Sequence, residues 1–282
     1  MKNLCLKKNI FRNIFTFIII ISINKTCLSQ YKSTQEFGVI SGVGYYTGDI
    51  SPTHYENSRL AGGITYRKNL DRRFTFKSSM LYTNIYADDA NSSNPIKINR
   101  NLKFKSDLIE LSGQIEFNFL PYETGNSLYS WSPYIFTGAS IFRFNPMSEA
   151  SDGRWYSLQE LGTEGQGTDG EYSYRKQYSL TQISIPFGGG VKIGINENFN
   201  IILEYGLRKT FTDYIDDIST TYVGVPVEWS GDEITIELAD RSLDGPQQSG
   251  IARGDDTTKD WYSFSGITLS FTLKGNSKEC NY

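Results

Sequence analysis

The stretch IELSGQIEFNF, residues 109–119, alternates between apolar and polar side chains along its whole length. Its odd-numbered positions carry aliphatic residues, phenylalanine or glycine, and its even-numbered positions carry glutamate, serine, glutamine or asparagine. This period of two predicts a β-strand with one apolar face and one polar face. The stretch FNIILEYGLRKTF, residues 199–211, follows the same rule, with Ile202 and Lys209 as exceptions.

The same alternation recurs along the chain and, with the turn signals between segments, predicts eight strands. Most of them exceed the usual strand length of about 5 to 6 residues. Strands of about 10 residues are long enough to cross a bilayer when they are tilted. The predicted strands are Glu36–Tyr46, Ser58–Lys68, Arg73–Ala87, Ser106–Phe119, Pro133–Phe144, Tyr178–Ile195, Phe199–Thr212 and Trp261–Leu273.

The predicted connections differ in length. Residues 69–72 and 196–198 form short turns, and residues 120–132 form a connection of intermediate length. The loops after the first, third, fifth and seventh strands are longer, and two of them occupy approximately residues 145–177 and 213–260. All the longest loops therefore fall at one edge, which is typical of outer-membrane barrels with short periplasmic turns and long exterior loops.

A closed barrel pairs its backbone N–H and C=O groups between strands, so it can cross hydrocarbon without unsatisfied polar groups. In this topology one aliphatic face would contact outer-membrane lipid: Val39, Val43, Ile64, Ile115, Ile135, Ile185, Val191, Ile201, Leu203, Ile267 and Leu269. Aromatic residues near the strand ends would form interfacial girdles: Tyr45, Tyr66, Phe74, Phe119, Phe199, Phe211, Trp261 and Phe271. The sequence thus predicts an all-β fold, an eight-stranded antiparallel transmembrane β-barrel with long exterior loops.

The interior of an eight-stranded barrel is just wide enough to be filled by side chains, which disfavours an open solute channel. Buried charges require partners, so we expect a paired network among the inward charges, which are Arg67, Lys77, Glu110, Glu116, Lys192, Glu204 and Arg208. A proton relay or catalytic carboxylate pair among Glu110, Glu116 and Glu204 is the sharper alternative, but no spacing in the sequence favours it.

A soluble barrel of the lipocalin type, with a ligand inside and its polar face outward, is the alternative fold. The length of the strands favours the membrane, because most small soluble barrels use shorter ones. Aliphatic residues also gather on one face of each strand, while charges and glycines gather on the other.

The N-terminus has the features of a secretory signal peptide: basic residues, a short apolar centre around IFTFIIIIS and small residues before residue 30. We expect cleavage between Ser29 and Gln30, export to the outer membrane, and a single barrel domain over residues 30–282 with a tail at 274–282. A retained membrane anchor is the alternative. Cleavage would leave Cys280 as the remaining cysteine, which excludes an internal disulfide and zinc sites built from several cysteines.

The charge balance argues against nucleic-acid binding. The chain has 28 basic and 31 acidic side chains. Cleavage would remove five basic side chains and no acidic one, so the exported chain would carry 23 and 31 and a formal charge of about −8. Phosphate neutralisation needs clustered lysine and arginine.

The glycine-rich stretch LQELGTEGQG, residues 158–167, raises the possibility of a phosphate-binding loop. Such a loop needs a helix N-terminus after it, whereas strand-like sequence follows here. We therefore expect a turn-rich exterior loop, in which Trp155, Tyr156 and Leu158 pack against neighbouring loops. The later glycines at 188–190 suit close packing or curvature of a barrel wall.

Other candidate chemistry is weak. His54, near Asp49 and Glu56, is expected to be a solvated loop residue. Three acidic pairs lack the alternating spacing of a calcium loop and are expected to be solvated loop charges: Asp88–Asp89, Asp216–Asp217 and Asp255–Asp256. The sequence therefore predicts no catalytic, cofactor-binding or metal-ligating residue, no cofactor, no small-molecule substrate and no enzymatic activity.

Several motifs, taken in order, resemble the PorG family of outer-membrane barrels, which belongs to the type IX secretion system of Bacteroidetes. The matching segments cover nearly all of the exported chain: YTGDI at 46–50, RLAGGITYRKNLDRRF at 59–74, DLIELSGQIEFNFLPYE at 107–123, PYIFTGASIFRFNP at 133–146, GRWYSLQELGTEGQG at 153–167, SIPFGGGVKI at 184–193, LEYGLRKTFTDYIDDISTTYV at 203–223 and LADRS at 238–242.

The resemblance implies a structural role in protein secretion. It implies contact with periplasmic ring lipoprotein and partner subunits, which the topology would place at the turns 69–72, 120–132 and 196–198. The alternative is a small outer-membrane barrel unrelated to secretion, with a ligand-binding or enzymatic role in its exterior loops.

Overall fold

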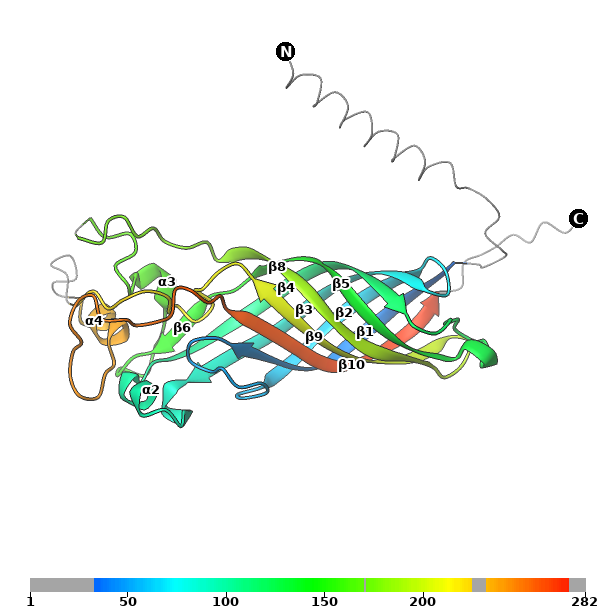
Figure 1. The fold of residues 1–282 in the computed structure, drawn as a ribbon, viewed down its shortest axis with the longest axis horizontal. Coiled ribbons are helices and arrows are strands. Elements are labelled where there is room, and N and C mark those ends of the chain that lie inside the picture. The colour runs from blue at the N-terminus through cyan, green and yellow to red at the C-terminus, as the bar shows by residue number, and fades with distance from the viewer. Residues whose placement is uncertain (1–32, 170, 225–231, 274–282) are drawn as a thin grey trace, which may run out of the picture. The chain divides into compact units, whose positions relative to one another are not determined.

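The computed structural model describes residues 33–169, 171–224 and 232–273, and it contains a closed antiparallel β-barrel (Figure 1). Strands pair in the order β3-β2-β1-β10-β9-β8-β5-β4, and β3 also pairs with β4, which closes the barrel. The wall strands are β1 (Thr34–Thr47), β2 (Arg59–Asn69), β3 (Phe74–Asp88), β4 (Lys103–Asn118), β5 (Trp131–Arg143), β8 (Thr181–Gly194), β9 (Phe199–Thr210) and β10 (Trp261–Leu273). The predicted eight-stranded fold is therefore confirmed, whereas the predicted signal peptide and tail lie outside the described residues.

The wall strands differ from their predicted bounds by a few residues. The largest extension is at the start of β4, because Lys103 pairs with Asp88 and lengthens the β3–β4 hairpin to the loop end of the barrel. The largest shortening is at the start of β8, where Tyr178 belongs to the preceding loop rather than to the strand.

Side chains alternate between the outer wall and the lumen along each strand, as the period of two predicts. On β4, Ile109, Leu111 and Ile115 are about half exposed, at 45%, 57% and 46%, while Glu110 and Glu116 are buried. The outer face is therefore an apolar belt in the middle of the wall. Tyr45 is the exception among the predicted girdle residues, because it is buried.

Tyr45 is buried because the first loop packs against it. Its ring lies 4.8 Å from that of Tyr55 and 5.8 Å from that of His54. Its hydroxyl forms hydrogen bonds of 2.9 Å with His54 Nδ1 and with the Tyr205 hydroxyl. The first loop therefore covers part of the outer wall.

The longer loops all lie at one end of the barrel and carry short elements (Figure 1). The hairpin of β6 (Pro146–Glu149) and β7 (Trp155–Ser157) extends the sheet, because β6 pairs with the start of β4. The other loop elements are the short helices η1 (Asp89–Asn91), α2 (Pro95–Arg100), α3 (Leu158–Leu161) and α4 (Glu233–Ala239). At the opposite end, η2 (Ser127–Tyr129) lies between β4 and β5. Within the described ranges, no helix combines the length and apolarity needed to span a membrane.

The glycines at 188–190 lie within an uninterrupted β8. A Cβ on Gly188 would lie 2.9 Å from the Phe136 ring, and a Cβ on Gly190 would lie 2.9 Å from the Tyr134 ring. These two inward positions therefore leave space for aromatic rings from the neighbouring strand, as the prediction of close wall packing requires.

Candidate functional site

The centre of the lumen is occupied by charged side chains from several strands. The Glu204 carboxylate of β9 accepts hydrogen bonds of 2.6 and 2.7 Å from Lys77 Nζ of β3 and one of 2.7 Å from the Tyr134 hydroxyl of β5. Arg67 of β2 lies 3.5 Å from Glu204 and 3.1 Å from Glu116. Arg67 therefore joins two of the three glutamates among which a catalytic pair was the sharper alternative.

The remaining predicted lumen charges are paired as well. Lys192 Nζ lies 2.6 Å from the Glu116 carboxylate. Closer to the loops, Glu110 accepts hydrogen bonds from Arg208 Nε at 3.0 Å and from the Tyr262 hydroxyl at 2.7 Å. All seven predicted charges are thus in the lumen and in ion pairs, which confirms the predicted network.

Glu36 of β1 is a lumen residue that the sequence analysis missed. Its carboxylate accepts hydrogen bonds from Asn69 at 2.7 Å, from Ser270 at 3.0 Å and from Thr124 at 3.1 Å. The period of two could have identified it, because Glu36 lies at the start of an alternating strand on the same face as Gly38 and Ile40. With Glu36, the buried charges of the described wall strands are four basic and four acidic.

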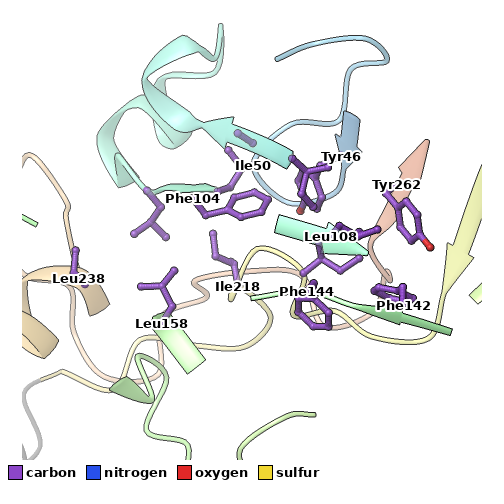
Figure 2. Packing of buried hydrophobic residues seen from close by; sticks show 14 of the residues in the cluster. Tyr46, Ile50, Phe104, Leu108, Phe142, Phe144, Leu158, Ile218, Leu238 and Tyr262 are labelled. Atoms are coloured by element: carbon purple, nitrogen blue, oxygen red, sulfur yellow. The ribbon is translucent and has the colours of Figure 1, made fainter. Parts of the chain in front are cut away.

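The loop end of the lumen is filled by apolar side chains instead (Figure 2). Phe104, Leu108 and Phe142 are buried members from the wall, and Ile218 and Leu238 join the same cluster from the loop after β9. We call this cluster the loop core; its buried members are Tyr46, Ile50, Ile85, Ala87, Leu102, Phe104, Leu108, Phe142, Phe144, Ala150, Leu158, Ile215, Ile218, Leu238 and Tyr262. The long loop after β9 therefore folds over the barrel mouth.

The stretch LQELGTEGQG contributes to this closure through Leu158 and Glu164. Leu158 is buried in the loop core, as predicted, whereas Trp155 lies against Lys105 on the outer wall. Gly162 ends α3 with a φ of 65°, a left-handed conformation that suits glycine. The segment therefore contributes an apolar side chain, Leu158, and a carboxylate, Glu164, to the packed loops.

The Glu164 carboxylate is fully buried, and sequence reasoning did not identify it. It lies 3.1 Å from Arg253 Nη1 and accepts hydrogen bonds from the backbone N–H groups of Ser219 at 3.0 Å and Thr220 at 3.1 Å. These contacts connect the loop after β5 to two parts of the loop after β9. The sequence around Glu164 does not indicate that its carboxylate is buried, because the residues that contact it are distant in the chain.

Two further carboxylates beneath the loops share one tyrosine. The Tyr46 hydroxyl lies 2.5 Å from Asp216 Oδ2 and 2.8 Å from Asp260 Oδ1. A hydroxyl donates a single proton, so the second contact is a hydrogen bond when that carboxyl carries a proton. Burial, with the neighbouring Asp260 charge adding to it, raises the pKa of Asp216 well above its usual range, and burial does the same to the pKa of Asp260.

The acidic pairs correct the prediction of solvated charges. Asp216, Asp217 and Asp89 are buried, and hydrogen bonds offset the cost of their burial; Asp89, for example, lies 2.7 Å from Arg100 Nε. Burial raises the pKa of Asp217 to about 6, despite hydrogen bonds from Thr163 and Tyr178 and the nearby Arg253. Burial also raises the pKa of Asp213 to about 6.

The prediction of solvated charges is confirmed for Asp255 and Asp256, which are exposed. His54 is exposed, as predicted, but is held by Tyr45 rather than by an acidic neighbour. Across the part of the chain that the structure describes, no group of three or more histidine, cysteine or acidic side chains is arranged to hold a metal ion.

Comparisons with solved structures concern the fold alone. Ail, the attachment invasion locus protein of Yersinia pestis, is similar at a TM-score of 0.41 and 9% identity, over 86% of this chain and 100% of that one. Neisserial surface protein A is similar at 0.43 and 7%, over 86% and 100%. OprG from Pseudomonas aeruginosa is similar at 0.34 and 10%, over 85% and 94%.

No curated protein matches the sequence. One family profile does, over residues 12–156, which is just over half of the chain. That stretch includes β1 to β5, the β6 strand and part of β7. The chain has an outer-membrane β-barrel fold and belongs to the family described as Domain of unknown function (DUF6089).

Proposed function

We propose that this chain is a structural, non-enzymatic barrel of the outer membrane that contacts periplasmic subunits of the type IX secretion system. The observation that carries a structural role is the filled lumen. Paired charges occupy its centre and the loop core occupies its mouth. A barrel whose lumen is filled by its described residues acts through its surfaces: the wall in lipid, the loops outside and the turns in the periplasm.

The secretion role is supported by the resemblance of the loop and strand motifs to the PorG family. It is also supported by an exposed apolar surface at the turn end of the barrel. Leu128 in η2 is 83% exposed, and Ile195 in the turn between β8 and β9 is 53% exposed. Exposed apolar surface marks a protein interaction site where it is contiguous, and Leu128 and Ile195 lie on the two segments that bound one hollow.

The surface around Leu128 is held in a defined shape. A hollow of about 320 Å³ lies between residues 125–130 and residues 194–196. Arg72 of the neighbouring turn pairs with Glu123 at 2.9 Å and lies 4.5 Å above the Tyr129 ring. Two of the three turns proposed to face the periplasmic subunits are thus joined, and the third lines the hollow.

Export from a deletion strain tests the proposal. The strain would carry a reporter with the type IX C-terminal signal, and wild-type protein, Leu128→Glu or Leu243→Glu would be supplied in trans. Leu243 is a matched control, since it is 66% exposed in an exterior loop. We expect the deletion to block export, wild type and Leu243→Glu to restore it, and Leu128→Glu to restore it poorly.

Unimpaired export in the deletion strain would refute the secretion role. Full restoration by Leu128→Glu would refute only the assigned contact surface. Each variant should migrate differently before and after boiling on a denaturing gel, which verifies that the barrel has folded.

A second candidate function is ligand binding by the exterior loops. A hollow of about 410 Å³ lies there between the first, third and seventh loops and is lined by Asp49, Lys97 and Arg100, among others. Lys97 and Arg100 already donate hydrogen bonds to the backbone oxygen of Asp49, so some of their N–H groups are engaged. Normal export combined with retention of a small molecule by the purified protein would favour this function.

A further inference from the structure

We propose that a basic hollow on the outer wall of the barrel binds the phosphorylated headgroup of an outer-leaflet lipid. The hollow has a volume of about 560 Å³ and lies where the β6–β7 hairpin projects beside β3 and β4. We call it the wall hollow; the residues that line it are Arg59, Asn84, Tyr86, Lys103, Lys105, Asp107, Glu149 and Trp155. It is separate from the lumen and from the turn end, so it does not depend on the proposed secretion role.

The wall hollow lies directly above the apolar belt. Lys105 shares the outer face of β4 with Ile109 and Leu111, which are 45% and 57% exposed. On β3, Tyr86 shares the outer face with Tyr82 and Met80, each 49% exposed. The same two strands therefore present an apolar surface for acyl chains and, at its loop end, cations for a headgroup.

The spacing along β4 agrees with this placement. Lys105 is four residues from Ile109, which is roughly 13 Å along a strand and about 10 Å along the membrane normal at the usual strand tilt. The headgroup layer is roughly 5 to 8 Å thick on each side of the hydrocarbon. A long lysine side chain can bring its charge back to that layer.

Two cations in the hollow are available to an anion. Lys105 Nζ lies 3.5 Å from the centre of the Trp155 ring, and the Arg59 guanidinium lies 4.8 Å from that of Tyr86. Neither belongs to an ion pair with another described residue. A cation held against a ring is positioned by it, yet keeps N–H groups for a phosphate.

The other charges of the hollow are already engaged. Lys103 pairs with Glu149 at 3.0 Å. The Asp107 carboxylate accepts hydrogen bonds of 2.8 Å from the Tyr82 hydroxyl and the Asn84 amide. The unpaired positive charge of the hollow therefore lies at Lys105 and Arg59.

Retention of lipid by the full-length protein tests this inference. Detergent-solubilised protein would be mixed with phosphorylated lipid A or with the same lipid after enzymatic removal of its phosphates, and bound lipid would be counted by native mass spectrometry. The variants are Lys105→Ala with Arg59→Ala, and Lys209→Ala as the control. Lys209 is also an exposed cation at the loop end of the outer wall, 5.9 Å from the Trp261 ring, but lies on β9 outside the hollow.

We expect wild type and Lys209→Ala to retain one phosphorylated lipid, and the double variant to bind it about tenfold more weakly or worse, because two charge-assisted contacts are lost. Wild type should bind the dephosphorylated lipid about as weakly as the double variant binds the phosphorylated lipid. Equal retention by the double variant, or an equal loss in Lys209→Ala, would overturn the assignment. Heat-dependent gel migration of each variant verifies folding.

Discussion

The lumen and the loop region both bury charged groups, but in different balance. The wall strands bury four basic and four acidic side chains. Among the described loop residues, six carboxylates are buried, whereas Arg253 is buried and Arg100 is nearly so. Inside the wall, charge is neutralised by opposite charge; beneath the loops, carboxyl groups must in part be neutralised by protons. The two regions should therefore respond differently to mutation and to pH.

Removing Glu204 should have the largest effect. Glu204→Ala leaves Lys77 without its carboxylate and Arg67 with one partner fewer in a buried site. Loss of one member of a buried ion pair costs about 3 to 5 kcal/mol. The urea midpoint of the barrel in lipid vesicles measures this change. A midpoint shift equivalent to less than about 1 kcal/mol would mean that the lumen charges are solvated rather than paired.

An apolar deletion in the loop core should destabilise the protein slightly less. Leu108 is fully buried, and replacing a buried leucine by alanine costs about 2 to 5 kcal/mol. We expect Leu108→Ala to increase protease cleavage in the loop after β9, while heat-dependent gel migration of the barrel persists. If cleavage is unchanged, the loop core does not hold that loop in place.

The loops bury more carboxylates than cations, so a rise in pH from 4 to 7 should destabilise them. The pKa of Asp217 is raised from 3.8 to about 6, so its contribution is fully present below about pH 4 and is lost as the pH rises through about 6. At about 1.4 kcal/mol per pKa unit, the change is about 3 kcal/mol. Asp217→Asn should flatten the fall in urea midpoint between pH 4 and pH 7. An unchanged slope would assign the dependence to Asp213, Asp216 or Asp260.

The smallest effect is expected at the turn end. Arg72 and Glu123 form an ion pair, but their side chains are 43% and 29% exposed. Pairs of this kind contribute about 0 to 1 kcal/mol. Arg72→Ala should therefore leave the urea midpoint within about 1 kcal/mol of wild type, and a larger loss would show that the turn also supports the wall.

The sequence predicted the wall and its charges because both follow a local rule. Each strand buries one face, so the period of two identifies inward residues such as Glu110 and Glu204 without knowledge of their partners. The same rule marks Ile202 as an exception, and it is a buried apolar residue on the polar face.

The loop region follows no such rule. Glu164 is buried by contacts with Arg253, which lies 89 residues away, and with the backbone of Ser219 and Thr220. Neither the glycine pattern around Glu164 nor the acidic pair Asp216–Asp217 distinguishes a solvated loop from a packed one. Burial of these carboxylates depends on how separate loops assemble over the mouth, which is a property of the tertiary structure.

The spacing of the lumen partners has a consequence for how the barrel assembles. Lys77 and Glu204 are 127 residues apart, and Glu36 on the first strand meets Ser270 on the last across 234 residues. An incomplete sheet would present these groups to hydrocarbon without their partners, which is costly. Insertion and closure should therefore occur in one cooperative step, because unpaired lumen charges destabilise partly formed barrels.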